Sequence, residues 1–166
     1  MRRLLELTWR RAFGALLSPA ALREVSQRWH NEAHLAGQTS LRDCFFAVAE
    51  AGSRKGLAGL GRLLGLVTAT RTGRRAVFLN RLYVRPGRQG GGLGERLLSA
   101  AWKAFPGVQG MRLEVLKDNG RAIAFYRRHG FRVTGSKAVR LEAGTLRLAV
   151  MKARRDRRFV ASVKGT

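Results

Sequence analysis

Cysteine, proline and acidic residues are scarce in this chain. Its single cysteine, Cys44, excludes an internal disulfide and a cysteine-rich zinc site. With only three prolines beside twenty glycines, the chain is neither proline-rich nor collagen-like. No apolar run reaches the roughly 18 residues that a membrane-spanning helix needs, so no membrane span is predicted. The apolar fraction of 45% is ordinary for a folded domain and argues against global disorder.

The shortage of acidic residues leaves a large positive charge. Ten Asp and Glu residues stand against 33 Lys and Arg residues, which gives a formal net charge of +23. Such a field attracts polyanionic or acidic partners: nucleic acid, anionic lipid, phosphorylated cofactors and acidic proteins. It repels cations, which argues against a polyamine substrate. The alternative, that the charges are merely scattered over a solvated surface, stays open.

The length of 166 residues fits one domain, which we expect to comprise residues 1–152, followed by a basic tail at 153–166. Residues 1–17 predict a packed helix whose apolar face is formed by Leu5, Trp9, Ala12, Phe13 and Leu16. Two alternatives stay open for this segment, a twin-arginine export signal at Arg10-Arg11 and a helix on a membrane surface. Because no convincing cleavage site follows, we expect a cytoplasmic protein.

The remaining pattern predicts an α/β domain. A helix capped by Ser18, with Pro19 at its first position, extends to Gly37. It is followed by three apolar segments, interpreted as central strands covered on both faces, at 44–49, 63–70 and 76–84. A helix with its buried face between Leu93 and Phe105 and a strand at 111–116 come next, and then a helix capped by Asn119 and closed by Gly130. A hairpin at 131–141 and 145–151 ends the fold. The strand–helix–strand segment through 76–116 predicts a right-handed crossover and a parallel pair of strands.

A glycine-rich loop joins the strand ending at Val84 to the following helix. Its backbone N–H groups and the positive end of the helix form an anion site suited to a pyrophosphate. It is not a Walker A loop, because no Gly-Lys-Ser/Thr follows, and it lacks a dinucleotide-binding fingerprint. The plainer interpretation is a loop that only turns the chain. No metal site is predicted, since His30 and His34 lie one helical turn apart without a third ligand nearby.

Two motifs resemble those of the GCN5-related N-acetyltransferase (GNAT) family. Gln89-x-x-Gly92-x-Gly94 resembles the acyl-CoA pyrophosphate loop of that family. The segment from Asn119 to Phe131, N-x-x-A-x-x-F-Y-x-x-x-G-F, resembles its second signature. The resemblance implies a mixed central sheet, flanked by helices, in which two parallel strands splay apart to hold acetyl-CoA. The family's first strand is missing here, or is degenerate at Arg3–Leu7.

The resemblance also implies roles for individual residues. An acetyl group would move from acetyl-CoA to a primary amine of a small molecule or a protein N-terminus, by direct attack on the thioester. The residues implied in cofactor binding are Leu82, Tyr83, Val84, Gln89, Gly90, Gly91, Gly92, Leu93, Gly94, Glu95 and Asn119. The remaining phosphate of the cofactor would meet Arg88, Arg121 or Arg128. Members of the family often form dimers, so a homodimer is a further expectation.

Two residues are the candidates for proton transfer. Tyr126 resembles the family's tyrosine acid, and a half-buried aromatic is its alternative interpretation. Glu114 matches the glutamate base of the subgroup that acetylates ribosomal-protein N-termini, and an ion pair with Arg112 or Arg132 is its alternative. Arg81, in the preceding strand, would favour an acceptor that carries a carboxylate.

Two other function classes stay open. One is a nucleic-acid- or ribosome-binding protein that uses its basic surface, with charge as its only support. The other is a non-catalytic acyl-CoA sensor that keeps the loop without working acid–base groups.

Overall fold

The computed structural model describes residues 14, 17–29, 43–51 and 63–156. The predicted helix at 1–17, the family's first strand at Arg3–Leu7, His30, His34 and most of the predicted tail lie outside these residues. In the described ranges, no helix has both the length and the apolar character that a membrane crossing requires.

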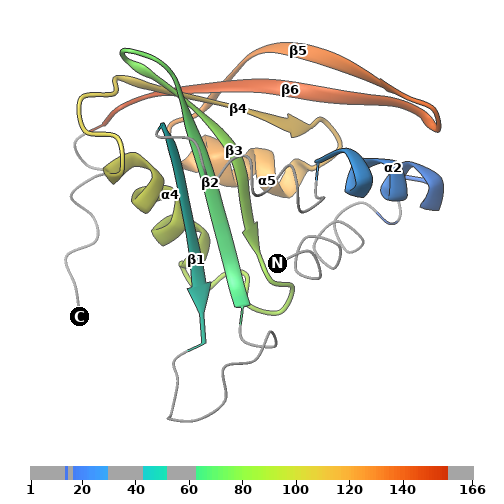
Figure 1. The fold of residues 1–166 in the computed structure, drawn as a ribbon, viewed down its shortest axis with the longest axis horizontal. Coiled ribbons are helices and arrows are strands. Elements are labelled where there is room, and N and C mark those ends of the chain that lie inside the picture. The colour runs from blue at the N-terminus through green and yellow to red at the C-terminus, as the bar shows by residue number, and fades with distance from the viewer. Residues whose placement is uncertain (1–13, 15–16, 30–42, 52–62, 157–166) are drawn as a thin grey trace.

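The described chain forms three helices and one six-stranded sheet (Figure 1). Along the chain the elements are α2 (Pro19–Trp29), β1 (Cys44–Glu50), β2 (Leu63–Gly73), β3 (Ala76–Val84), α4 (Leu93–Lys103), β4 (Gly110–Leu116), α5 (Gly120–Arg128), β5 (Arg132–Leu141) and β6 (Gly144–Arg154). The strand order is β1-β2-β3-β4-β6-β5, and only β3 and β4 are parallel. The predicted mixed sheet with a parallel crossover is therefore confirmed.

One prediction about the strands was wrong. The apolar segment at β1 was expected to be a central strand covered on both faces, but among the described strands β1 lies at the edge of the sheet, with β2 as its pairing partner. Its alternate side chains are partly exposed, with Val48 43% exposed. An apolar run does not distinguish an edge strand from a central one, because strand order depends on contacts distant in sequence.

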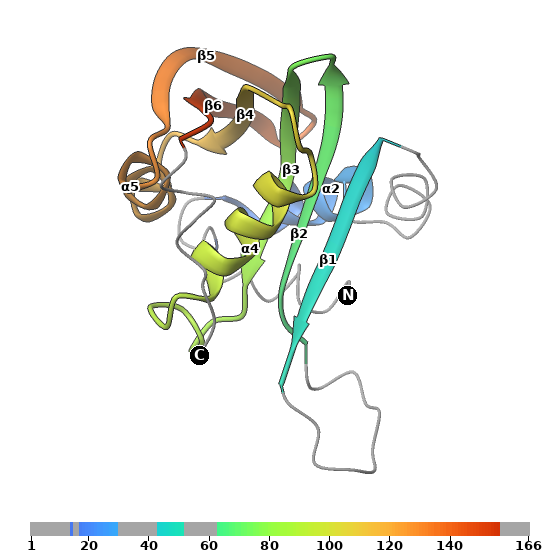
Figure 2. The same cartoon turned by 90° about the vertical axis from the view of Figure 1, so that its left-hand side faces the viewer.

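The main core lies between the sheet and the two helices α4 and α5. Its buried side chains include Leu98 and Trp102 of α4, Tyr126 of α5, and Met111 and Leu113 of β4. Figure 2 shows α4 lying along the half of the sheet formed by β1, β2 and β3. Burial of these apolar faces is the main force that holds both helices on the sheet.

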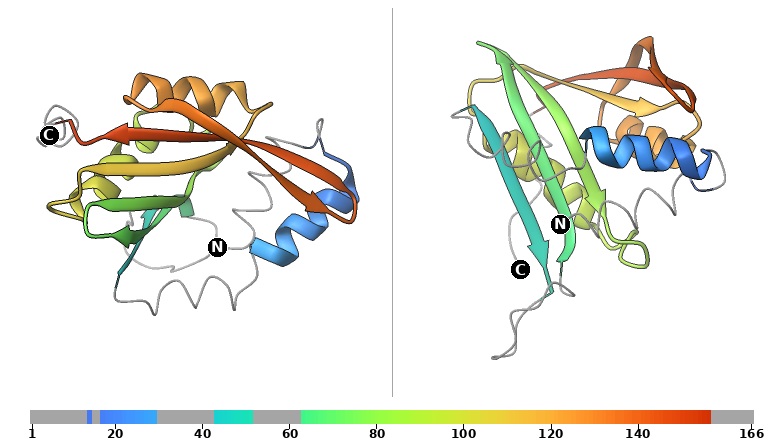
Figure 3. Two further views of the ribbon diagram at one scale, coloured as in Figure 1. Left: turned by 90° about the horizontal axis from the view of Figure 1, so that it is seen from above. Right: turned by 45° about the vertical axis from the view of Figure 1, so that its right-hand side comes forward.

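The other face of the sheet carries α2. Ser18 caps this helix by accepting a hydrogen bond at Oγ from the N–H of Ala21, at 3.2 Å, as the Ser-Pro pair predicted. Glu24 fastens α2 to the β5–β6 turn, because its carboxylate accepts hydrogen bonds from the N–H groups of Glu142 and Ala143. Figure 3 shows α2 beneath the far end of this hairpin.

The parallel strands separate after four residue pairs. β3 and β4 pair from Ala76 opposite Gly110 to Leu79 opposite Leu113, and no pairing follows. At this point the β2–β3 register shifts, so that Thr68 faces Arg81 and Ala69 faces Leu79, leaving Asn80 as an extra residue. A bulge bends a strand and increases its local twist, which accounts for the divergence seen in Figure 1.

The end of the sheet extends beyond its predicted limit. β6 continues to Arg154, and the Arg155 guanidinium donates hydrogen bonds to the carbonyl oxygens of Trp102, Phe105 and Val108. These contacts close the end of α4 against the last strand. The first residues assigned to a basic tail therefore belong to the folded sheet.

Candidate active site

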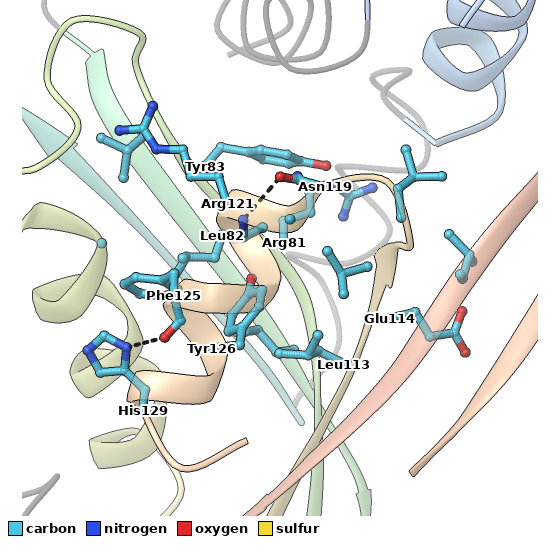
Figure 4. A pocket seen from close by; sticks show the side chains of 18 of the residues that line it. Arg81, Leu82, Tyr83, Leu113, Glu114, Asn119, Arg121, Phe125, Tyr126 and His129 are labelled. Atoms are coloured by element: carbon cyan, nitrogen blue, oxygen red, sulfur yellow. Dashed lines mark hydrogen bonds between the residues drawn. The ribbon is translucent and has the colours of Figure 1, made fainter. Parts of the chain in front are cut away.

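A cleft of about 1100 Å³ opens where β3 and β4 diverge. The second half of β3, the following loop and the start of α4 form one wall, and β4 with the β5–β6 hairpin forms the other. Residues of α5 also line the cleft, as Figure 4 shows for Arg121, Phe125, Tyr126 and His129. Nearly all residues singled out from the sequence thus lie around one cavity.

The glycine-rich loop positions the start of α4 beside the cleft. Gly90 and Gly92 adopt positive φ angles of 94° and 74°, which side chains other than glycine rarely adopt. Gly92 is the N-cap of α4 and supplies no side-chain cap, so the first N–H groups of the helix have no capping partner from it. Gln89, Gly94 and Glu95 also line the cleft, whereas the predicted Gly91 and Leu93 do not. Leu93 packs against the main core instead.

The last residues of β3 present their backbone to the cleft. Leu82, Tyr83 and Val84 line it and pair with β2 on one side only, because β4 has already moved away. Backbone groups on the open side are therefore accessible to a ligand. One of them has a protein partner, since the Gln89 side-chain nitrogen donates to the carbonyl oxygen of Val84 at 3.2 Å.

Asn119 has a structural role as well as a place in the cleft. Its side-chain oxygen accepts a hydrogen bond from the N–H of Ala122 at 3.1 Å, which caps α5 as predicted (Figure 4). With the oxygen engaged, the side-chain nitrogen is the atom that can donate towards the cleft.

Tyr126 stands on α5 with its side chain only 8% exposed, packed in the main core and lining the cleft. Burial raises the pKa of its hydroxyl well above the ordinary value, and the nearby Tyr83 raises it further. The phenol is therefore a proton or hydrogen-bond donor at any physiological pH.

Glu114 is the carboxylate of the opposite wall. The Lys137 ammonium of β5 lies 3.1 Å from its Oε2, and the Arg112 guanidinium of the same strand lies 3.3 Å from its Oε1. The predicted partner Arg112 is confirmed. Arg132 lies at the other end of β5, and Lys137 was not foreseen. The Glu114 side chain is 16% exposed, so the acid is partly shielded and held by two cations.

Arg81 is buried in the wall formed by β3, with 6% of the residue exposed. Burial lowers the pKa of its guanidinium, although Tyr83 and Cys44 act in the opposite direction. Two further arginines, Arg121 and Arg128, line the cleft at α5, whereas Arg88 is not part of the lining.

Several lining residues were missed by the sequence analysis. His129 donates a hydrogen bond from Nδ1 to the carbonyl oxygen of Phe125, 2.8 Å away (Figure 4). The hairpin adds Lys137, Val139, Leu146 and Leu148. The alternation of side chains along each strand would have placed these four hairpin residues on one face of the sheet. It would not have placed them beside Glu114. Across residues 14, 17–29, 43–51 and 63–156, no three His, Cys, Asp or Glu side chains gather closely enough to hold a metal ion.

Comparison with known families identifies one domain type. The sequence profile described as "Acetyltransferase (GNAT) domain" matches residues 42–133, which is more than half of the chain. The match spans β1 to β4, the glycine-rich loop, α4 and α5, and ends before most of the β5–β6 hairpin. No protein with curated function matches the chain by sequence.

Solved structures share the fold at low sequence identity. The PaiA N-acetyltransferase of Thermoplasma acidophilum, in complex with coenzyme A, is similar with a TM-score of 0.72 and 19% identity, covering 93% of this chain and 90% of its own. Arabidopsis thaliana NAA60, in complex with a bisubstrate analogue, has a TM-score of 0.62 and 18% identity, with 84% and 96% covered. The spermidine/spermine N-acetyltransferase SpeG of Vibrio cholerae has a TM-score of 0.57 and 18% identity, with 74% and 72% covered.

Proposed function

Because this chain belongs to the GNAT acetyltransferase family, we propose that it transfers the acetyl group of acetyl-CoA to a primary amine. The observation that carries this proposal is the divergence of β3 and β4. It exposes strand backbone between the N-terminus of α4, which has no side-chain cap from Gly92, and two side chains that are able to exchange protons, Glu114 and Tyr126. The acceptor is an amine of a small molecule or of a protein N-terminus.

The wall formed by β3, the glycine-rich loop and the start of α4 is suited to bind acetyl-CoA, and we call it the donor wall. A Cβ atom built at Gly90 or Gly92 would meet no protein atom within 4 Å, so the loop faces open space where a pyrophosphate can lie. The N–H groups of residues 90–95 would bind that pyrophosphate, as helix N-termini bind other anions. The backbone of Leu82–Val84 and the Asn119 side-chain nitrogen would hold the pantetheine arm. Arg121 and Arg128 of α5 line the same cleft and add positive charge to it.

Acetyl transfer requires a neutral amine, because an ammonium has no lone pair to attack a carbonyl carbon. We assign proton removal to the Glu114 carboxylate, acting directly or through one water. Its contacts with Arg112 and Lys137 fix the carboxylate in place at the acceptor side of the cleft. The proton then passes from Glu114 to solvent.

The other charges that develop in the reaction lie on the donor side. Acetyl-CoA supplies the thioester, whose C–S bond breaks as the new C–N bond forms. A backbone N–H of residues 82–84 would stabilise the negative charge on the carbonyl oxygen. Tyr126 would donate to the departing sulfur, because its raised pKa keeps the hydroxyl protonated. The nitrogen is positively charged once the C–N bond has formed, so it releases its second proton to solvent, and the Tyr126 hydroxyl takes up a proton from solvent in exchange.

The proposal is tested by incubating the purified protein with acetyl-CoA and a panel of primary amines. Products are measured by mass spectrometry, because the free thiol of Cys44 would interfere with a thiol-specific dye. The expected result is acetylated amine and free CoA in equal amounts, at a rate lowered at least about tenfold by Tyr126→Phe. Saturable binding of acetyl-CoA without acetylation of any amine would favour a non-catalytic acyl-CoA sensor instead.

A further inference from the structure

Four apolar side chains line the cleft on the acceptor side, next to Glu114. They belong to three neighbouring strands, and the register places Leu116 opposite Leu148 and Val139 opposite Leu146. Facing residues of paired strands have their side chains on the same side of the sheet, so the four form one continuous patch. We call this patch the apolar wall; its members are Leu116, Val139, Leu146 and Leu148.

The apolar wall continues the cleft towards α2. Val25 of α2 packs in one cluster with Leu116 and Leu146, which are 7% and 4% exposed. Val139 and Leu148 lie at the edge of that cluster and are only half-buried. Glu24 holds α2 in this position through its hydrogen bonds to the hairpin turn. Two members of the wall are thus covered by protein, and two are accessible from the cleft.

Within the described residues, the apolar wall itself carries no charge, and charged side chains lie beside it. Lys137 of β5 lies opposite Leu148 of β6 in the strand register. Its ammonium group forms an ion pair with Glu114. Arg81 lines the facing strand β3. An acceptor with a second positive charge would meet these two cations. A charged group of either sign placed on the wall itself would lose its hydration without gaining a partner there.

On the basis of the acetyltransferase function proposed above, we propose that the acceptor is a primary amine with an apolar substituent. The amine lies at Glu114 and the substituent covers Val139 and Leu148. Binding removes the accessible part of the wall and the apolar group of the acceptor from water together, which favours the complex. The protein therefore discriminates among amine acceptors by the length of their apolar chain and not by a second charged group.

A series of linear primary amines tests the proposal, with kcat/KM measured at saturating acetyl-CoA. From ethylamine through butylamine to hexylamine, kcat/KM should rise by about fourfold for each methylene that reaches the wall, the ratio that corresponds to about 0.8 kcal/mol per buried CH2. Hexylamine is then compared with hexamethylenediamine and ε-aminocaproate, which share its chain length but end in an ammonium or a carboxylate. Hexylamine should be the best of these three substrates.

A matched pair of variants tests the location. Val139→Ser shortens and polarises an accessible member of the wall, whereas Val133→Ser makes the same change on the same strand at a residue that is 46% exposed and outside the cleft. Val139→Ser should lower kcat/KM for hexylamine by about fivefold or more, and this loss should exceed the loss for ethylamine, whose chain is too short to cover the wall. Val133→Ser should change neither value.

The outcomes separate this proposal from the function on which it rests. A flat alkyl series, or a preference for hexamethylenediamine or spermidine, would overturn the apolar acceptor while leaving acetyl transfer established. A preference for ε-aminocaproate would also overturn it and would direct attention to Arg81. Failure to acetylate any amine would overturn the proposed function itself.

Discussion

The Nζ atom of Lys137 lies 3.1 Å from Oε2 of Glu114, joining the edge strand β5 to β4 across the intervening β6. The lysine side chain is 52% exposed, whereas the glutamate side chain is 16% exposed. Solvent therefore screens the pair, and its contribution to stability stays below about 1 kcal/mol. The main effect of this ion pair is to hold the Glu114 carboxylate in position at the edge of the cleft.

Glu114→Gln should abolish proton removal and preserve the shape of the wall. We expect kcat to fall by about a hundredfold or more, with the Kd of acetyl-CoA changed by less than about twofold. Asp118→Asn is the matched control, since Asp118 is another carboxylate that lines the cleft but is exposed. Equal loss of kcat in both variants would argue against Glu114 as the base.

Gly92 and Gly87 form a second matched pair, with φ angles of +74° and +83°. A Cβ atom at either position meets no protein atom within 4 Å, but only Gly92 lines the cleft. Alanine at each site should cost about 1–2 kcal/mol of stability, because both positions are left-handed. Calorimetry should show that Gly92→Ala weakens acetyl-CoA binding at least about tenfold and that Gly87→Ala has little effect. Similar losses of acetyl-CoA affinity in the two variants would show that backbone strain alone causes the effect.

Asn119 combines a helix cap with a cleft donor, and two substitutions separate these roles. Asn119→Ser keeps a capping oxygen and removes the amide nitrogen, so stability should change little while acetyl-CoA affinity falls by about three- to tenfold. Asn119→Ala should lower affinity and also cost about 1 kcal/mol in urea unfolding. Unchanged affinity in the serine variant would remove Asn119 from the donor site.

Tyr126 should remain protonated beyond the normal range of tyrosine. The chain has two tyrosines, so Tyr83→Phe leaves Tyr126 alone. An ultraviolet titration of that variant should show no tyrosinate step near the ordinary value of about pH 10 while the protein stays folded. A step at the ordinary value would show that the hydroxyl is not buried.

The same pKa shift predicts an alkaline loss of stability. Because the folded-state pKa of Tyr126 lies above the unfolded value, its contribution to stability is complete below about pH 10 and is lost as pH rises through the folded-state pKa. The difference in unfolding free energy between the protein and Tyr126→Phe should therefore shrink above that pH. Urea unfolding at neutral and alkaline pH measures this difference.

Elements with local signals were predictable from sequence. The bounds of β3 at Ala76 and Val84 are as expected, because a Thr-Gly turn precedes the strand and Pro86 follows it. The caps at Ser18 and Asn119 were predictable for the same reason, since each is satisfied by an N–H three residues away. These features need no knowledge of the rest of the fold.

Contacts that depend on register were not predictable. Lys137 reaches Glu114 only because β5 and β6 pair with a shift between Val133 and Gly135. The sequence does not mark that shift, so Arg112 and Arg132 were the predicted partners of Glu114 and Lys137 was not. The edge position of β1 and the apolar wall beside Glu114 likewise arise from strand order, which joins segments distant in the chain.

A calorimetric titration of acetyl-CoA into the protein tests most simply whether the cleft binds this cofactor. About 300 mM salt screens non-specific attraction of a polyanion to the positive surface, and ATP serves as a control of similar charge. We expect saturable binding at one site, tighter than that of ATP and weakened by Gly92→Ala. Binding no tighter than that of ATP, or unaffected by this substitution, would contradict the assignment of the cleft to acetyl-CoA.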